Sequence, residues 1–466
     1  MSKDIVVIGG GTAGARLARQ LTRRPLPAAG PAGPAGGAVP TASAVTVIGE
    51  EDHAPYNRVL LAEVLAGRYG PDVIALPGTP VRRGVRVVRI DRAERVVQCD
   101  DGSVVPYGTL VLATGSNPVL PPLRGLGAEL PDGVHPFRTL DDCLALAAAV
   151  RTGTRAVVIG GGLLGVSAAR ALAERGAQVV LAQQGEHLMQ RHLDPAASEL
   201  LRGHLEALGV EVHTECRVRG LRCEAGTVRA VELADGYALD ADLVVLACGV
   251  RPRVGLAQAA GLEVRHGIVV DDELRTSDPR IRAIGDCAEH DGRVYGLAGP
   301  ALEQADILAA LLLSSHPAAP PATPSADHAV ATAAATAGPA ISVHGPVGGP
   351  PPRYTGTRAL TRLTLSGNSN GTTGPDAATA TAAAAFAATG PLDLAAFGET
   401  NPLPGDDVVR LTDATRGAYR KVVVRGDRLI GGILLGDLGA VGELARTWEG
   451  DEPLPSTPLF HLLGGA

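Results

Sequence analysis

Short runs of consecutive apolar residues, bounded by glycine or polar residues, recur through the first half of the chain. They lie at residues 5–8, 45–48, 156–159, 179–181 and 243–247. Runs of this length without polar alternation are typical of strands buried on both faces of a parallel sheet. Helical segments, for example residues 13–24 and 163–175, lie between them. Strands that alternate with helices predict an α/β, doubly wound fold.

Three stretches interrupt this pattern. Residues 25–41 and 314–352 are rich in Pro, Gly and Ala, and residues 366–390 are rich in Ala, Thr, Gly and Asn. Segments of this composition lack the apolar side chains that are needed to bury a core. We therefore interpret all three as flexible insertions.

The hydrophobic pattern changes after residue 352. Short strands are expected at residues 360–365, 408–411, 419–424 and 429–435. The last two flank the sequence Arg-Gly-Asp-Arg at residues 425–428, which is typical of a hairpin turn. This part of the chain is expected to form a small α+β C-terminal domain.

Composition narrows the class of protein. The chain has 466 residues, which suggests about three domains, and a formal net charge of -7. Acidic and basic residues are mixed along it, which argues against a nucleic-acid surface. There is neither a run of ~18 apolar residues nor a signal-peptide pattern, so we expect no membrane association and a cytoplasmic protein. The six cysteines lack metal-binding spacing, so reduced thiols and no metal site are expected.

A glycine-rich motif follows the first predicted strand and opens the first predicted helix. Gly9 permits a tight turn, Gly11 lets a pyrophosphate approach the backbone, and Gly14 lets helix and strand pack closely. An acidic residue that binds a ribose is expected about 20 residues further on. Glu50 ends the next strand 36 residues after Gly14, and removing the 17 residues of the first insertion leaves 19. These residues predict a dinucleotide site, with the phosphates at the helix N-terminus.

The same arrangement recurs after the strand at residues 156–159. Gly160, Gly162 and Gly165 occupy the three glycine positions. The following strand ends in Gln183 instead of an acid, and no arginine follows directly to bind a 2′-phosphate. Two basic residues further on are either phosphate ligands or solvated surface residues: His187 and Arg191. The pattern predicts a second dinucleotide site, with Gln183 at the ribose position, and leaves NADH and NADPH both open.

Two further segments resemble the flavoprotein reductases that contain two dinucleotide-binding domains. One is Ala-Thr-Gly at residues 113–115, with Thr114 and Gly115 following a predicted strand, and the other is Ala-Ile-Gly-Asp at residues 283–286. In that family the aspartate of the second motif, here Asp286 after Gly285, binds the ribityl chain of the flavin. The resemblance implies FAD at the first glycine motif and NADH or NADPH at the second. A helix that begins near residue 299 would then direct its N-terminus at the flavin ring.

Other segments narrow this resemblance. The sequences PYNRVLL at residues 55–61, GDCA at residues 285–288 and YRKVVV at residues 419–424 are similar to assimilatory nitrite reductase large subunits. They are similar too to nitrate-assimilation electron-transfer reductases and rubredoxin reductases. In the first segment, Arg58 fits either a phosphate-neutralising role or an ion pair. Some relatives carry lysine near the flavin where Glu63 stands here.

The resemblance implies a division of the chain into domains. An FAD-binding domain would be formed by residues 1–115 and 250–315, and an NAD(P)-binding domain by residues 116–249. A linker at residues 316–352 would lead to the C-terminal domain at residues 353–466. The expected fold class is α/β, with two Rossmann-like domains and a small α+β C-terminal domain.

The expected function is electron transfer from NAD(P)H through FAD to a separate acceptor protein. The acceptor would be a rubredoxin- or ferredoxin-type protein, or a nitrate or nitrite reductase subunit. The cofactors carry out the chemistry, so no catalytic side chain is assigned. Six arginines between residues 82 and 95 form either a docking patch for an acidic partner or, as we favour, the solvent face of strands.

Two alternatives to electron transfer stay open. The first is an oxidase or a disulfide or peroxide reductase of the same fold, although residues 50–65 contain no cysteine that could serve as a redox thiol. The second is a flavin-binding regulatory subunit that does not turn over, which the missing acid at Gln183 would favour.

Overall fold

The computed structural model describes residues 4–22, 44–78, 80–127, 129–314, 352–365, 391–413, 417–450 and 453–454. The three predicted insertions, at residues 25–41, 314–352 and 366–390, lie outside the described residues except for residues 314 and 352, and residue 314 is the last residue of the preceding helix. Among the described residues, no helix is both long and apolar enough to cross a bilayer.

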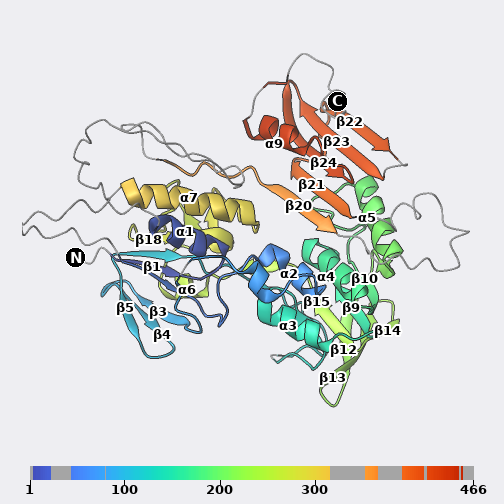
Figure 1. Cartoon of the computed structure of the whole chain (residues 1–466), viewed down its shortest axis with the longest axis horizontal. Helices are drawn as coiled ribbons and strands as arrows, with labels where there is room; N and C mark the ends of the chain where they lie inside the picture. The colour runs from blue at the N-terminus through green and yellow to red at the C-terminus, as the bar shows by residue number, and fades with distance from the viewer. Residues whose placement is uncertain are drawn as a thin grey trace, which may run out of the picture.

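The first sheet is parallel and has the strand order β18-β6-β1-β2. Its strands are β1 (Ile5–Ile8), β2 (Val45–Ile48), β6 (Thr109–Leu112) and β18 (Ile281–Ala283). Every residue of β1 is buried, as expected for a strand that is covered on both faces. Helices α1 (Thr12–Thr22) and α7 (Ala298–Ser314) lie together on one side of the sheet (Figure 1). The antiparallel sheet of β3 (Val87–Asp91), β4 (Val96–Cys99) and β5 (Val104–Pro106) lies on the other side.

The second sheet is also parallel, with the order β11-β10-β9-β15-β8. Its strands are β8 (Val134–Pro136), β9 (Arg155–Ile159), β10 (Gln178–Ala182), β11 (Val210–His213) and β15 (Leu243–Leu246). The helices of this unit are α3 (Leu140–Ala149), α4 (Leu163–Glu174) and α5 (Pro195–Ala207). An antiparallel sheet adjoins it, formed by β12 (Val218–Glu224), β13 (Thr227–Leu233) and β14 (Ala238–Asp240).

The chain leaves the first unit, builds the second and then returns. The outgoing strand β7 (Ser116–Pro118) and the returning strand β16 (Val250–Pro252) pair with each other antiparallel. After the return, the chain forms α6 (Gly255–Ala259) and the parallel pair β17 (Ile268–Val270) and β19 (Ala288–His290). The two Rossmann-like units are therefore joined by two adjacent crossings.

The C-terminal part is an antiparallel sheet with the order β20-β21-β24-β23-β22. Its strands are β20 (Leu360–Leu365), β21 (Leu392–Gly398), β22 (Asp407–Asp413), β23 (Ala418–Arg425) and β24 (Arg428–Leu435). Arg425 pairs with Arg428 around Gly426, whose φ of +64° suits a tight turn, so the predicted hairpin is confirmed. Strand β21 was not predicted, because its alanine-rich sequence lacks the β-branched residues typical of strands.

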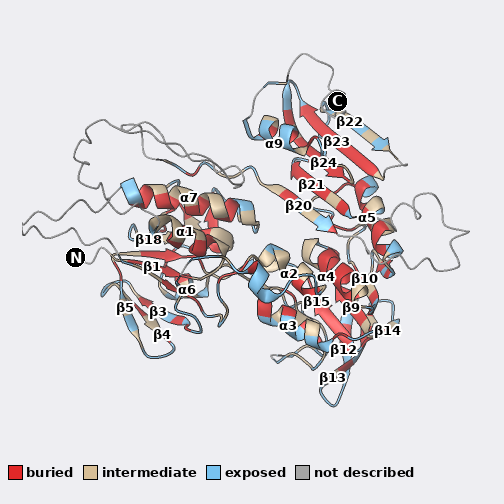
Figure 2. Ribbon diagram, viewed as in Figure 1, coloured by how far each residue is buried: buried red, intermediate tan, exposed pale blue. Residues whose placement is uncertain are grey.

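The central strands β23 and β24 of the C-terminal sheet are buried on both faces (Figure 2). One face packs against α9 (Val441–Gly450), where the rings of Phe397 and Trp448 lie with centroids 5.2 Å apart. The other face joins the core of the second Rossmann-like unit. The predicted fold class, two Rossmann-like units with a small C-terminal α+β domain, is confirmed.

Candidate functional site

The first glycine motif forms a tight connection between β1 and α1. Gly9 has φ +114°, and a Cβ atom on Gly14 would lie 2.0 Å from the carbonyl oxygen of Gly9, so both positions require glycine. In contrast, a Cβ on Gly11 would meet no atom within 4 Å. The loop thus leaves open space above its second glycine, where a phosphate group could approach the backbone.

The second motif, between β9 and α4, repeats this geometry. Gly160 has φ +111°, and a Cβ on Gly165 would lie 1.7 Å from the Gly160 carbonyl oxygen. Nothing lies within 4 Å of a Cβ built on Gly162. Each loop lies at the carboxyl end of its parallel sheet, which is where doubly wound folds bind ligands. Both loops therefore fit a bound dinucleotide.

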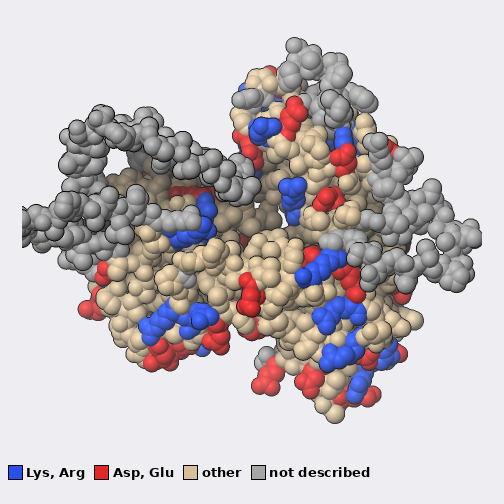
Figure 3. All heavy atoms as spheres, in the orientation of Figure 1, with Lys and Arg blue, Asp and Glu red and all other residues tan. Residues whose placement is uncertain are grey.

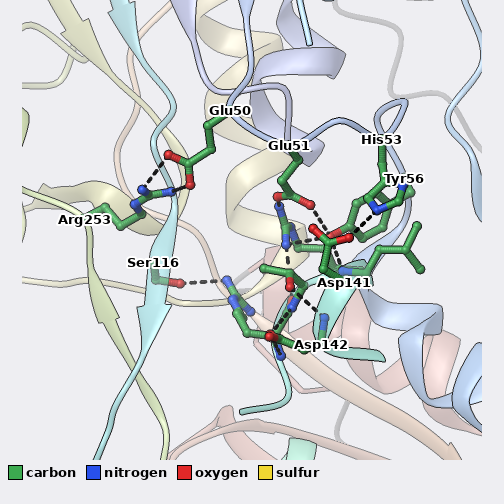
Figure 4. A network of polar contacts seen from close by, with 12 residues as sticks. Glu50, Glu51, His53, Tyr56, Ser116, Asp141, Asp142 and Arg253 are labelled. Atoms are coloured by element: carbon green, nitrogen blue, oxygen red, sulfur yellow. Dashed lines mark hydrogen bonds and ion pairs between the residues drawn. The ribbon is translucent and has the colours of Figure 1, made fainter. Parts of the chain in front are cut away.

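Glu50 follows β2 beside the first loop. Its carboxylate forms a two-pronged ion pair with Arg253, with distances of 2.5 and 2.8 Å (Figure 4). The main chain of Arg253 accepts a hydrogen bond from the Thr114 hydroxyl at 2.8 Å and donates one to the Gly115 carbonyl at 2.9 Å. The structure thus brings together three residues that the sequence singled out separately, through an arginine that sequence reasoning missed.

Gln183 follows β10 at the matching place in the second unit. Its side-chain oxygen accepts a hydrogen bond from the Gly161 amide at 2.8 Å, and its side-chain nitrogen donates to the His187 carbonyl at 3.4 Å. Gln183 therefore holds the glycine loop itself. Arg191, the other basic candidate, is exposed.

Asp286 lies in the turn Gly285–Cys287 that follows β18. Its carboxylate accepts hydrogen bonds from Arg138 at 2.5 Å and from the Ser116 hydroxyl at 2.9 Å. Arg138 also donates to Ser116 at 2.7 Å. Arg138 lies 148 positions before Asp286 in the sequence, so no local pattern could have identified it.

The turn around Gly285 lies between α1 and α7. The Gly285 amide donates a hydrogen bond to the side chain of Gln304 on α7 at 2.7 Å, and Gln304 is almost fully buried. A Cβ built on Gly285 would lie 3.1 Å from the side chain of Ala13 on α1. The predicted helix near residue 299 is present as α7, and its first half contacts the turn that carries Asp286.

Arg58 lies in an internal network of polar groups. It forms an ion pair with Glu51 and donates to the Tyr56 hydroxyl at 2.9 Å and to the Arg138 carbonyl at 3.2 Å (Figure 4). Tyr56 donates to Glu51 at 2.7 Å, and burial, as the largest cause, raises the pKa of its hydroxyl well above 10. Of the two roles expected for Arg58, the structure shows the ion pair, within a network that reaches Arg138 beside Asp286.

Glu63 takes part in a second ion-pair network. Its carboxylate bonds to Arg170 at 2.5 Å and to Arg68 at 2.9 Å, and both arginines also bond to Glu174, at 3.0 and 2.6 Å. The Arg170 side chain is only 1% exposed. Because Glu63 lies on α2 (Leu61–Leu65) and Arg170 on α4, this closed ring joins the first Rossmann-like unit to the second.

The six arginines between residues 82 and 95 do not form a free basic patch. Four of them pair with nearby aspartates: Arg82 with Asp101, Arg86 with Asp100, Arg89 with Asp91, and Arg92 with Asp278. Acidic and basic side chains are intermixed on the visible face of the molecule (Figure 3). This pairing agrees with the solvent-face interpretation.

Comparisons with known proteins agree with this geometry. The family model "Pyridine nucleotide-disulphide oxidoreductase" matches residues 3–305, and the model "Rubredoxin NAD+ reductase C-terminal domain" matches residues 390–449. The chain is 38% identical over 275 residues to the assimilatory nitrate reductase electron transfer subunit of Bacillus subtilis (strain 168), covering 57% of this chain and 35% of that protein. It is 29% identical over 480 aligned positions to the NAD(P)H nitrite reductase of the same organism, covering 99% and 49%.

The chain thus spans between 35% and 49% of the lengths of these two relatives. The crystal structure of the covalent putidaredoxin reductase-putidaredoxin complex has the same fold, with a TM-score of 0.73 at 22% identity over 99% of this chain and 98% of that one. Because the first family model matches well over half of the chain, the protein belongs to the pyridine nucleotide-disulphide oxidoreductase family, which confirms the resemblance, the enzyme class and the cofactors FAD and NAD(P)H predicted from the sequence motifs.

Proposed function

We propose that this protein oxidises NAD(P)H with a bound FAD and passes the electrons to a separate acceptor protein. The observation that carries the proposal is the pair of glycine loops, each open above its second glycine and each at the carboxyl end of its own parallel sheet. Two such loops in one chain support two different dinucleotides, and the two adjacent crossings join the units that hold them.

The first loop would hold the FAD. Gly9, Gly11 and Gly14 would receive its pyrophosphate, and Glu50 would bind the adenosine ribose after release from Arg253. Thr114 and Gly115 line the same end of the sheet. Asp286, Gly285 and Arg58, with Arg138, form the polar cluster proposed to face the ribityl and phosphate groups.

The second loop would hold NADH or NADPH, through Gly160, Gly162 and Gly165, with Gln183 closing the loop beside the ribose position. The two loops would hold a hydride donor, the nicotinamide, and a hydride acceptor, the flavin, which would supply the redox chemistry. The contribution of the protein is to hold the two cofactors in place. No side chain is assigned a proton-transfer role.

The acceptor is proposed from the relatives. A rubredoxin- or ferredoxin-type protein, or a nitrate or nitrite reductase subunit, fits the two family models and the nitrate- and nitrite-reducing relatives. All six cysteines are free thiols, as a reducing compartment allows, so we place the protein in the cytoplasm.

Anaerobic stopped-flow mixing of the FAD-loaded protein with NADH or with NADPH tests the proposal. Loss of flavin absorbance within the mixing experiment is expected for at least one coenzyme, and the reduced protein should then transfer electrons to an added rubredoxin or ferredoxin. A bound flavin that neither coenzyme reduces would overturn the proposal and favour a non-catalytic, flavin-binding subunit. Rapid reoxidation by oxygen without transfer to any acceptor protein would favour an oxidase.

A further inference from the structure

The C-terminal sheet packs directly on the second Rossmann-like unit. One face of the sheet carries Leu394, Tyr419 and Ile433. These side chains belong to the same hydrophobic core as Leu193, which lies just before α5, and Leu201, which lies in α5. Figure 1 shows the sheet beside α5 and β20 near α4. The contact is therefore a continuous core, which transmits displacements between the elements that form it.

A buried ion pair lies within this apolar contact. The Lys421 ammonium is 2.8 Å from a carboxylate oxygen of Asp194, and the Tyr419 hydroxyl donates to the same oxygen at 2.6 Å. The side chains of Lys421 and Asp194 are only 2% and 8% exposed. Burial alone would raise the pKa of Asp194, but the hydrogen bonds from Lys421 and Tyr419 outweigh burial and lower it. The carboxylate is therefore charged and depends on these two partners.

Asp194 also ends the segment that covers the second glycine loop. Its other carboxylate oxygen accepts the Ala197 amide at 3.0 Å and so caps α5. In the segment before it, the Met189 amide donates to the Gly161 carbonyl at 2.8 Å. The Leu188 side chain lies against Gly161 so closely that a Cβ there would be 2.6 Å away. Residues 184–193 are thus packed onto the loop proposed to bind the coenzyme.

One residue of this segment has an unfavourable backbone conformation. Met189 has φ +49°, in the left-handed region of backbone conformation. Residues other than glycine, asparagine and aspartate rarely adopt this conformation. Such a residue persists where its surroundings determine its conformation. The middle of the segment is tied to Gly161 through Leu188 and Met189, and its end leads into Asp194, which the C-terminal sheet holds.

We propose that Lys421 and Tyr419 are positioning residues for NAD(P)H. By fixing Asp194 they keep residues 184–193 seated on Gly161, so that tight coenzyme binding requires the C-terminal sheet. The inference rests on the proposed coenzyme site at the second glycine loop. It assigns to the C-terminal domain a part in the binding of NAD(P)H by a loop more than 200 residues away in the sequence.

The test uses the full-length, FAD-loaded protein with Lys421→Met, which keeps the aliphatic stem and removes the charge. The dissociation constant of NAD+, measured by calorimetry, and the KM of the reducing coenzyme should both rise about 10-fold. The limiting rate of flavin reduction should change by less than about 2-fold, because the chemical step is untouched. Amide hydrogen exchange at Met189 should become faster, and this readout does not depend on activity.

Arg420→Met is the matched control. Arg420 is the adjacent residue on β23, faces the opposite side of the sheet and forms an ion pair with Asp437 inside the C-terminal part. This variant should weaken the sheet while leaving the NAD+ dissociation constant and the exchange at Met189 unchanged. If Arg420→Met weakens coenzyme binding as much as Lys421→Met does, general loss of C-terminal stability accounts for the effect and the inference is wrong.

Two further outcomes are decisive. If Lys421→Met does not fold, Tyr419→Phe takes its place, with an expected rise of about 3-fold in the dissociation constant because one hydrogen bond to Asp194 is lost. If the dissociation constant of NAD+ is unchanged in the folded variant, this inference is wrong but the proposed function still stands. Wild-type protein that binds no coenzyme at all overturns the proposed function, and this inference with it.

Discussion

The two glycine loops have the same backbone conformation but differ in the side chain that lies beside each of them. Both have a left-handed first glycine, an open second glycine and a third glycine that touches the first. Beside the first loop, the acid Glu50 is held by Arg253, whereas beside the second loop, the amide Gln183 is held by the loop itself. Under the proposed function, the backbone would receive the pyrophosphate at both sites, and the side chain beside each loop would contribute to the choice of nucleotide.

The largest effects are expected from valine at the second glycine of each loop, because each substitution should strongly weaken or abolish the binding of one cofactor only. Gly162→Val should keep FAD bound and lower the affinity for NAD(P)H about 100-fold or more, because the new side chain fills the space proposed for the pyrophosphate. Gly11→Val should do the reverse and yield protein without FAD. Flavin content after purification and coenzyme titration measure the two effects. Because neither valine Cβ meets protein atoms, thermal unfolding serves as the control and should change little when each variant is compared with wild-type protein of the same flavin content.

The next largest effect, on the free energy of unfolding, is expected from the ion-pair ring that joins the two Rossmann-like units. Arg170→Met should lower the free energy of unfolding by about 3 kcal/mol, since it leaves the partly buried carboxylates of Glu63 and Glu174 with only Arg68 as a partner. Urea unfolding measures this change. The control is Arg16→Met within the first unit, whose partly exposed pair with Asp306 should be worth at most about 1 kcal/mol. Equal effects of the two variants would show that the ring does not stabilise the joint.

Lowering the pH should destabilise the second Rossmann-like unit through one buried histidine. His204 on α5 is buried, and burial, with a smaller contribution from Arg170, lowers its pKa from 6.5 to about 4. Between these two values the unfolded chain binds a proton that the folded chain does not, so stability decreases as the pH falls through this window, by about 3 kcal/mol in total. Hydrogen exchange in α5 should accelerate over this range. A His204→Gln variant should not show the loss.

The smallest predicted effect concerns the choice of coenzyme. Gln183→Glu restores an acid at the ribose position and keeps a side-chain oxygen for the Gly161 amide. The ratio of kcat/KM for NADH to that for NADPH should rise about 10-fold, because a carboxylate binds the 2′-hydroxyl and repels a 2′-phosphate. Parallel kinetics with both coenzymes measure this ratio. A ratio equal to that of the wild type would mean that residue 183 does not face the ribose.

The sequence predicted the features that depend on local pattern. Both glycine loops, the hairpin at residues 425–428 and α7 follow from residue type and spacing over a few positions. Arg138 and Arg253 were missed because each bonds to a proposed site residue, Asp286 or Glu50, that lies more than 100 positions away in the sequence. Strand β21 was missed because its partners β20 and β24, rather than its own alanines, make it a strand.

The order of strands in the first sheet has a consequence for synthesis on the ribosome. Strand β6 ends at Leu112, but its neighbour β18 begins at Ile281, after the whole second unit has been made. At about 5–20 residues per second, the first sheet waits roughly 10–30 s for its last strand, while the second unit can already fold. The second Rossmann-like unit should therefore fold on the nascent chain before the first sheet is complete.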